Sequence, residues 1–208
     1  LNLNGKDNTA TGQRSLYSNT DGCSNTATGG FSLLLNTSGD YNTATGNSAL
    51  SQNSTGGCNT ATGAGALGSN TGSNNTAHGF GALATNITGF FNTAAGVDAG
   101  RYIADGATAN STTIRSTYIG GNTKASASGV VNETVIGYEA IGSGTNSVTI
   151  GSSLVTKTIL NGDVGIGTDA PNEALTVSGN ISASGNISAS GTVRGTNIDT
   201  LTNNVSAM

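Results

Sequence analysis

A five-residue segment, Asn-Thr-Ala-Thr-Gly, recurs through the first half of the chain at an almost constant spacing, and its last two copies differ only at the fourth residue. The six copies begin at Asn8, Asn25, Asn42, Asn59, Asn75 and Asn92. Successive copies are 17, 17, 17, 16 and 17 residues apart. A fixed period of this size is typical of a solenoid, in which each repeat forms one coil and stacks on the next.

Other residue types keep register with this segment. The position eight residues after its first Asn holds a leucine in five repeats and then a glycine: Leu16, Leu33, Leu50, Leu67, Leu83 and Gly100. A second turn rich in Asn and Gly follows, and the one short spacing falls within it, at residues 70–72. Turns tolerate such deletions, and no 3.6-residue periodicity indicates a helix. The sequence therefore predicts an all-β parallel roll of about 17-residue coils with the leucine column inside.

The composition excludes several other classes of protein. Disordered chains combine low hydrophobicity with high charge, whereas only 9 % of these residues are charged and their spacing is regular. The net charge is −4 and the seven basic residues are scattered, so we expect no nucleic-acid partner. No run of about 18 apolar residues occurs, so we expect no membrane insertion. Because the chain begins at Leu1 rather than Met, we expect a piece of a longer protein.

Beyond an irregular stretch at residues 97–115, the glycine that ends each strand returns with an isoleucine before it. These segments end at Gly120, Gly137, Gly151 and Gly167, with spacings of 17, 14 and 16 residues. Alignment on this glycine places Thr11 in the column of Ile136. Side chains two residues apart in a strand share a face. We therefore predict that Ile119, Ile136 and Ile150 belong to the core and that the aligned threonines point inward.

Threonine pairs in the first repeats are consistent with a different function, ice binding. Thr-x-Thr ladders on a flat solenoid face are the means by which several antifreeze proteins bind ice. Four repeats carry such a pair: Thr9/Thr11, Thr26/Thr28, Thr43/Thr45 and Thr60/Thr62. His78 and Ala95 interrupt the ladder, and the inward direction predicted for the threonines opposes this function. An ice-binding solenoid is therefore the last of three alternatives.

The C-terminal quarter predicts a change of architecture. Pro171 cannot donate a hydrogen bond to a sheet and bars Ala170 from a helix, so we expect the roll to stop there. Residues 178–195 then repeat every six residues, with one large apolar side chain each: Ile181, Ile187 and Val193. The last apolar residues follow the a and d spacing of a coiled coil: Ile198, Leu201, Val205 and Met208.

Both halves of the chain are too poor in large apolar side chains to form a core alone. One leucine per coil, with some threonine and alanine, buries little apolar area. One Ile or Val per hexad cannot form a core within a single chain, whereas three chains can share these side chains on a common axis. We therefore predict a homotrimer in which the hexads form a short intertwined β-prism or triple β-helix.

The repeat Asn-Thr-Ala-Thr-Gly-x-x-Ala-Leu-x-x-Asn-Thr-x-Gly resembles the repeats of trimeric autotransporter adhesin heads (YadA-like heads) and of phage tail fibres over residues 8–100. In those families the chain forms a left-handed parallel β-roll, with three copies about one axis. Residues 146–151 also resemble the adhesin-head repeat. Residues 164–179 resemble the segment that precedes an intramolecular chaperone of the endosialidase type in phage tail fibres and tailspikes. The resemblance implies that such a chaperone follows Met208 in the precursor and is cleaved.

These observations divide the chain into four predicted parts. Residues 1–100 form the 17-residue-repeat roll, and residues 101–167 form an irregular stretch followed by an adhesin-head-like roll. Residues 168–195 form a connector and the trimeric hexad segment. Residues 196–208 begin a coiled-coil stalk.

No constellation of residues indicates an enzyme. His78 has no cysteine or carboxylate at ligand spacing, and no column pairs two carboxylates as glycoside hydrolysis requires. We predict no catalytic, cofactor-binding or metal-binding residue and no cofactor, and we assign no binding residue. Cys23 and Cys58 lie two coils apart, too far for a disulfide, so we predict free thiols. Four aromatic residues near coil edges suit either sugar stacking or corner packing: Tyr17, Tyr41, Phe90 and Phe91.

The predicted function is therefore non-enzymatic attachment, as the shaft or receptor-binding part of a phage tail fibre, located in the virion and outside the cell. A trimeric adhesin on a bacterial surface is the alternative. The expected partners are two further copies of the chain, other tail or baseplate proteins, and a cell-surface glycan or protein receptor. Repeated loops presented in three copies convert weak single contacts into avidity.

Overall fold

A computed structural model describes residues 4–170 and 174–177 of the chain. This part of the chain contains eleven strands and no helix. The chain divides into two units, Leu1–Thr156 and Lys157–Met208. Among the described residues there is no helix that could cross a membrane. The hexads and the heptad residues predicted at the C-terminus lie outside the described residues.

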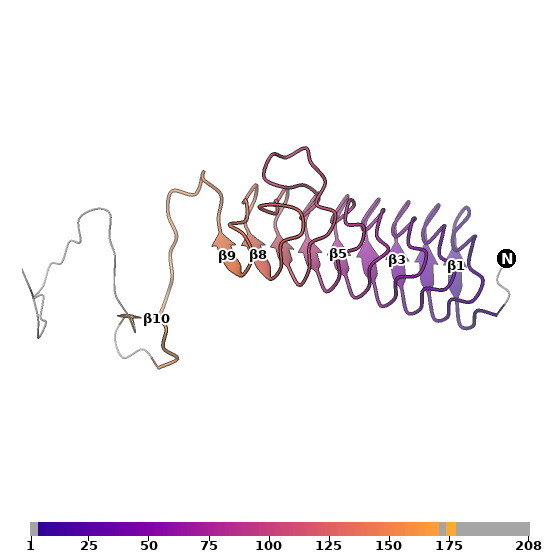
Figure 1. Ribbon diagram of the computed structural model, residues 1–208, viewed down its shortest axis with the longest axis horizontal. Helices are drawn as coiled ribbons and strands as arrows, with labels where there is room; N and C mark the ends of the chain where they lie inside the picture. Colours follow the sequence, from indigo (N-terminus) through magenta and orange to yellow (C-terminus); the bar gives the residue numbers. More distant parts are fainter. Residues whose placement is uncertain (1–3, 171–173, 178–208) are drawn as a thin grey trace, which may run out of the picture. The chain divides into compact units, whose positions relative to one another are not determined.

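Each coil of the first unit contributes one short strand to a single parallel sheet, and β1 to β9 follow one another in chain order along the stack (Figure 1). The strands are β1 Thr9–Thr11, β2 Thr26–Thr28, β3 Thr43–Thr45, β4 Thr60–Thr62, β5 Thr76–His78, β6 Thr93–Ala95, β7 Thr117–Ile119, β8 Glu133–Ile136 and β9 Ser147–Ile150. Ala27 pairs with Ala44, in the register that the repeat predicts. Thr60 pairs with Thr76 across the 16-residue step, so the deletion lies in the turn and leaves the sheet intact. The parallel β-solenoid is confirmed.

The leucine column lies inside the coils, as predicted. Leu33, Leu50, Leu67 and Leu83 are fully buried, and Leu16 in the first coil is 9 % exposed. The central alanines of the strands form a second buried column: Ala27, Ala44, Ala61, Ala77 and Ala94. A further buried alanine precedes the leucine position in four coils: Ala49, Ala66, Ala82 and Ala99. One leucine and one or two alanines per coil still make a small core for a coil of this length.

Tyr118 explains why the leucine column ends in a glycine. Tyr118 continues the alanine column, because it pairs with Ala94, and its side chain is fully buried. A Cβ atom at Gly100 would lie 2.6 Å from Cδ2 of the Tyr118 ring. The ring therefore occupies the space that a sixth leucine would fill.

Two columns of buried asparagines also run through the coils. The first contains the opening residue of each repeat: Asn25, Asn42, Asn59, Asn75 and Asn92. The second comes from the other turn: Asn19, Asn36, Asn53, Asn70 and Asn86. The first column forms a continuous ladder, in which the Asn42 backbone N–H donates to Oδ1 of Asn25 (2.9 Å). In the second column Nδ2 of Asn36 donates to Oδ1 of Asn19 (2.7 Å), but the ladder is interrupted after Asn53, whose Oδ1 has no hydrogen-bond partner. The ladders supply partners for buried turn groups that the short strands leave unpaired.

The prediction that Ile119, Ile136 and Ile150 belong to the core is wrong. Ile119 is 43 % exposed and Ile150 is 63 % exposed, while Ile136 is half-buried. The alignment of the repeats is correct, because Ala95 pairs with Ile119 and Ile119 with Ile136. The error lies in the choice of face. In a three-residue strand only the central side chain points into the coil, so both flanking columns point outward.

The second unit holds the remaining two strands. They are β10 Val164–Ile166 and β11 Leu175–Val177, which pair in parallel in a separate two-stranded sheet. The sequence alignment placed the segment ending at Gly167 in the same series as the earlier strands. That placement is wrong, because β10 does not join the nine-stranded sheet.

Candidate functional site

The outer face of the nine-stranded sheet carries two columns of side chains that flank the buried central column. In β1 to β4 both columns are threonine, and these threonines are exposed except for the half-buried Thr60. The inward direction predicted for them is therefore wrong. His78 and Ala95 follow in the second column, and His78 is exposed. The face thus presents hydroxyl groups over its first four strands.

The same face becomes apolar over its last three strands. The second column continues as Ile119, Ile136 and Ile150, and Val148 occupies the first column in β9. Val148 is 69 % exposed and Ile150 is 63 % exposed. Exposed apolar side chains that adjoin one another on a sheet are candidates for contact with another molecule. We call Ile119, Ile136, Val148 and Ile150 the apolar end of the sheet face.

A loop departs from the solenoid between β6 and β7. Thr93 pairs with Thr117, so this coil has 24 residues in place of 17. The extra residues lie in a loop at residues 101–110, which projects from the stack (Figure 1). Asp105 fixes its tip by accepting hydrogen bonds from Thr108 Oγ1 (2.5 Å) and from the backbone N–H of Ala107 (2.9 Å). These bonds lower the pKa of Asp105, the Thr108 hydroxyl contributing most.

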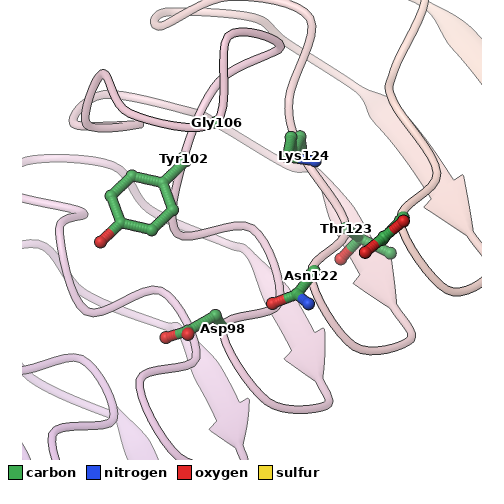
Figure 2. A pocket seen from close by; sticks show the side chains of 7 residues that line it. Asp98, Tyr102, Gly106, Asn122, Thr123 and Lys124 are labelled. Atoms are coloured by element: carbon green, nitrogen blue, oxygen red, sulfur yellow. The ribbon is translucent and has the colours of Figure 1, made fainter.

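A polar hollow of about 170 Å³ lies between this loop and the neighbouring coils (Figure 2). Its lining residues are Asp98, Tyr102, Gly106, Asn122, Thr123 and Lys124, together with Glu139. Arg101 forms an ion pair with Asp98 (Nη1 to Oδ1, 2.7 Å), and this contact raises the pKa of Arg101. The Arg101 guanidinium also lies over the Tyr102 ring, 5.0 Å from its centroid.

One carboxylate is fully buried beside the end of the first asparagine ladder. The backbone N–H of Ser116 donates to Oδ1 of Asn92 (2.9 Å), and that of Glu133 donates to Oγ of Ser116 (3.1 Å). The Glu133 carboxylate accepts hydrogen bonds from the Gly144 backbone N–H (2.9 Å) and from the Tyr118 hydroxyl (3.2 Å). The groups around the Glu133 carboxylate are backbone N–H groups and neutral side chains of neighbouring coils. Its hydrogen bonds therefore join these coils to one another.

Burial raises the pKa of the Tyr118 hydroxyl, because the tyrosinate form would lie in the core beside Glu133. The folded chain therefore retains this proton at a pH where the unfolded chain loses it. We expect the free energy of unfolding to be independent of Tyr118 ionisation below pH ~10 and to fall above it, by up to about 1.4 kcal/mol per pH unit. Denaturant unfolding between pH 8 and 11 measures this slope, which Tyr118→Phe should reduce.

The matched control for this slope is Tyr138→Phe, because Tyr138 is 63 % exposed. It should leave the alkaline slope unchanged. An equal reduction of the slope in both variants would contradict the assignment to the buried hydroxyl.

The described residues hold no group of three or more His, Cys, Asp or Glu side chains that could bind a metal ion. Cys23 and Cys58 are free thiols, as predicted. Of the four aromatic residues singled out in the sequence, Tyr17, Tyr41 and Phe91 are more than half exposed. Phe90 is half-buried and packs edge-on against Phe91, with ring centroids 5.6 Å apart. The structure does not bring these four residues together with the polar hollow.

Comparison of the chain with protein-family models, with curated proteins and with solved structures gives no match. The function is therefore inferred from the two surfaces described above, namely the sheet face and the polar hollow. Sequence reasoning identified the threonine pairs of the sheet face but predicted that they point inward, placed the isoleucines of its apolar end in the core, and assigned no residue of the polar hollow. The 24-residue spacing between Gly96 and Gly120 was the one signal in the sequence that marked the position of the loop.

Proposed function

We propose that the chain is a non-enzymatic attachment fibre that acts as a homotrimer, with the apolar end of the sheet face packed against the other two chains. The observation that carries this proposal is the exposure of Ile119, Val148 and Ile150, which are 43, 69 and 63 % exposed in a single chain. Burial of a Val or Ile side chain contributes about 1.5–3 kcal/mol. Association about this face would supply the apolar burial that the small coil core lacks.

Two features of the sequence support three chains rather than two. The hexads at residues 178–195 offer one Ile or Val each, which suits a shared threefold axis. The repeats over residues 8–100 resemble those of trimeric adhesin heads and phage tail fibres. The left-handed coil, the β-prism or triple β-helix and the coiled-coil stalk are parts of the same proposal. A phage tail fibre in the virion is the favoured identity, and a bacterial surface adhesin is the alternative.

The proposed mechanism is mechanical. The stack holds its turns at fixed positions, because each strand pairs with the next in constant register. Three parallel copies would present each turn three times to a cell surface. When several copies bind at once, the overall affinity exceeds that of one copy, although each copy makes the same contacts. The receptor would be a cell-surface glycan or protein, and tail or baseplate proteins would hold the other end of the fibre.

Substitution of Ile119, Ile136 and Ile150 by threonine tests this proposal. Threonine occupies the same column in β1 to β4, so the coils accept it without a change of fold. We expect the trimer of 20.3 kDa chains to dissociate at higher protein concentrations than the unmodified trimer does, because the sheet-face contact is lost and only the C-terminal contacts remain. Native mass spectrometry or sedimentation equilibrium measures this change.

A matched control changes Leu35, Ile87 and Val97 to threonine. These side chains are 45, 46 and 54 % exposed and lie outside the strands of the sheet. This control should keep the oligomeric state of the unmodified chain. Equal weakening of the trimer in the control, or an unchanged dissociation of the trimer in the first variant, would rule out the sheet face as the interface.

A second candidate function, ice binding, is favoured by one observation. The threonine pairs of β1 to β4 face outward on a regular sheet, in strands that stack about 4.8 Å apart. The sequence-based objection that these threonines point inward no longer holds. Thermal hysteresis separates the two candidates. The attachment fibre should show none, whereas hysteresis that disappears in a Thr45→Lys variant would favour ice binding and refute the fibre.

A further inference from the structure

The polar hollow beside the loop has the size and chemistry of a site for one sugar ring, and we propose that it binds a terminal monosaccharide unit of a glycan. Its volume is about 170 Å³, which is smaller than the roughly 300–1,000 Å³ of sites for drug-sized ligands. The hollow is therefore suited to a single small ring. The inference deepens the proposed attachment function and rests on it for its biological role.

The hollow presents both hydrogen-bond acceptors and donors. Glu139 contributes a carboxylate to the lining. Lys124 contributes an ammonium group, and Asn122 both a carbonyl oxygen and an amide nitrogen (Figure 2). Within the described residues, the ion pair of Arg101 with Asp98 does not involve Lys124 or Glu139. A ligand with a net charge would be attracted either by the Lys124 ammonium or by the Glu139 carboxylate, and repelled by the other. A neutral ring with adjacent hydroxyl groups can accept a hydrogen bond from Lys124 and donate one to Glu139.

Tyr102 adds an aromatic surface to the wall of the hollow. Aromatic rings combine a large apolar area with few rotatable bonds, so they bind the C–H face of a ring ligand at little cost in entropy. The Arg101 guanidinium over this ring and its ion pair with Asp98 restrict the positions of both side chains. Tyr102 and Asp98 are thus held in place before any ligand arrives.

The loop itself is fixed against the coil that follows it. The Ala125 backbone N–H donates to the carbonyl of Tyr102 (3.1 Å), and Ile103 forms a parallel bridge with Ala125. At the base of the loop, Nδ2 of the buried Asn110 donates to the carbonyl of Gly100 (3.0 Å). These bonds make the hollow a pre-formed feature of the folded coil, which reduces the cost of binding.

Saturation-transfer NMR on the full chain tests the inference, with the methyl glycosides of glucose, galactose, mannose and N-acetylglucosamine as probes. We expect at least one to bind with a Kd of the order of 1 mM, since a single ring makes few contacts. Glu139→Gln and Asn122→Gly should each weaken binding at least about tenfold. Glycine suits position 122 because Asn122 has a φ of 54°.

Matched controls come from the first coil. Asp7 has a φ of 58°, close to the 55° of Glu139, and Asp7→Asn should leave binding unchanged. Tyr102→Ala should abolish binding, whereas Tyr17→Ala should not, although Tyr17 also has an arginine over its ring, Arg14 at 6.0 Å.

Absence of saturation transfer from all four glycosides would overturn the inference, and so would equal binding by the hollow variants and their controls. The native mass of the same sample separates the two proposals. A trimer that binds no glycoside would refute the sugar site alone. A single chain that binds one would refute the trimeric fibre alone.

Discussion

Alanine in place of Gly63 will lower the free energy of unfolding by about 4 kcal/mol, because neither the backbone nor the neighbouring coil can accept a Cβ atom there. Gly63 has a φ of 129°, a region that L side chains rarely adopt. Its Cβ would lie 2.5 Å from the carbonyl oxygen of Gly79 and 2.6 Å from the carbonyl carbon. These are backbone atoms of the next coil, which cannot move without breaking the stack. Urea unfolding followed by circular dichroism measures the loss.

Gly30→Ala is the control for this prediction. Gly30 has an ordinary φ, and the nearest atom to its Cβ would be Nδ2 of Asn47, at 3.2 Å, the end of a flexible side chain. Other coils carry side chains in this column, among them Gln13 and Asn47. The free energy of unfolding should change by less than about 0.5 kcal/mol. An equal loss in both variants would mean that the close approach of the coils does not limit stability.

Substitution of Asn59 by alanine should cost about 3 kcal/mol, because it breaks the first asparagine ladder in its middle. Oδ1 of Asn59 accepts from the backbone N–H of Asn75 (2.9 Å), and its Nδ2 donates to the carbonyl of Gly72 (2.9 Å) and to Oδ1 of Asn42 (3.1 Å). All three asparagines are fully buried, so no water replaces these bonds. Unpaired buried groups cost about 1–3 kcal/mol each. Thermal or urea unfolding of the variant tests this value.

Asn47→Ala provides the comparison for the ladder variant. Asn47 is exposed and accepts a hydrogen bond from the Ser48 hydroxyl (3.0 Å). Its removal should change the free energy of unfolding by less than about 0.5 kcal/mol. If Asn59→Ala were as harmless as this control, the buried ladder would not contribute to stability.

The coil architecture could be predicted from the sequence because periodicity is directly visible in it. The leucine column, the register of the strands and the position of the one-residue deletion followed from counting, and each is confirmed. A stack of coils repeats each residue at the same place, so an alignment of the repeats is already an alignment in space.

The choice of face could not be predicted in the same way. In Thr-Ala-Thr the side chains are small, and hydrophobicity alone does not decide whether Ala27 or its two neighbours point inward. The isoleucines at 119 and 136 suggested the flanking columns, since apolar side chains are usually buried. In a single chain Ile119 is exposed and Ile136 is half-buried, and both now belong to the surface proposed as an interface.

The asparagine ladders and the residues with positive φ at the corners of the coil could not be predicted from the sequence either. Asn and Gly are the common residues of turns, where asparagine tolerates positive φ and bonds to its own backbone. The asparagines of the two ladders do not adopt positive φ; the residue before each opening Asn does, such as Ser24 at 55°, and so do leucines such as Leu50 at 51°. Asn42 bonds to the coils before and after it, which only the stacking of identical residues brings within reach.

The polar hollow could not be predicted from the sequence for a different reason. An irregular stretch between repeats was visible in the sequence, but its chemistry was not. The lining residues Asp98, Asn122 and Glu139 come from three successive coils, and only the fold of the loop against the following coil brings them together. Spacing locates such an insertion, whereas its contacts depend on tertiary structure.

The native mass of the unmodified chain tests the trimeric attachment fibre most directly. Sedimentation equilibrium across a range of concentrations gives this mass without assuming a shape. Three chains, each of 20.3 kDa, are expected, with the apolar end of the sheet face buried between them. A single chain at every concentration, folded and with that face open to water, would contradict the fibre and leave the solenoid to act alone.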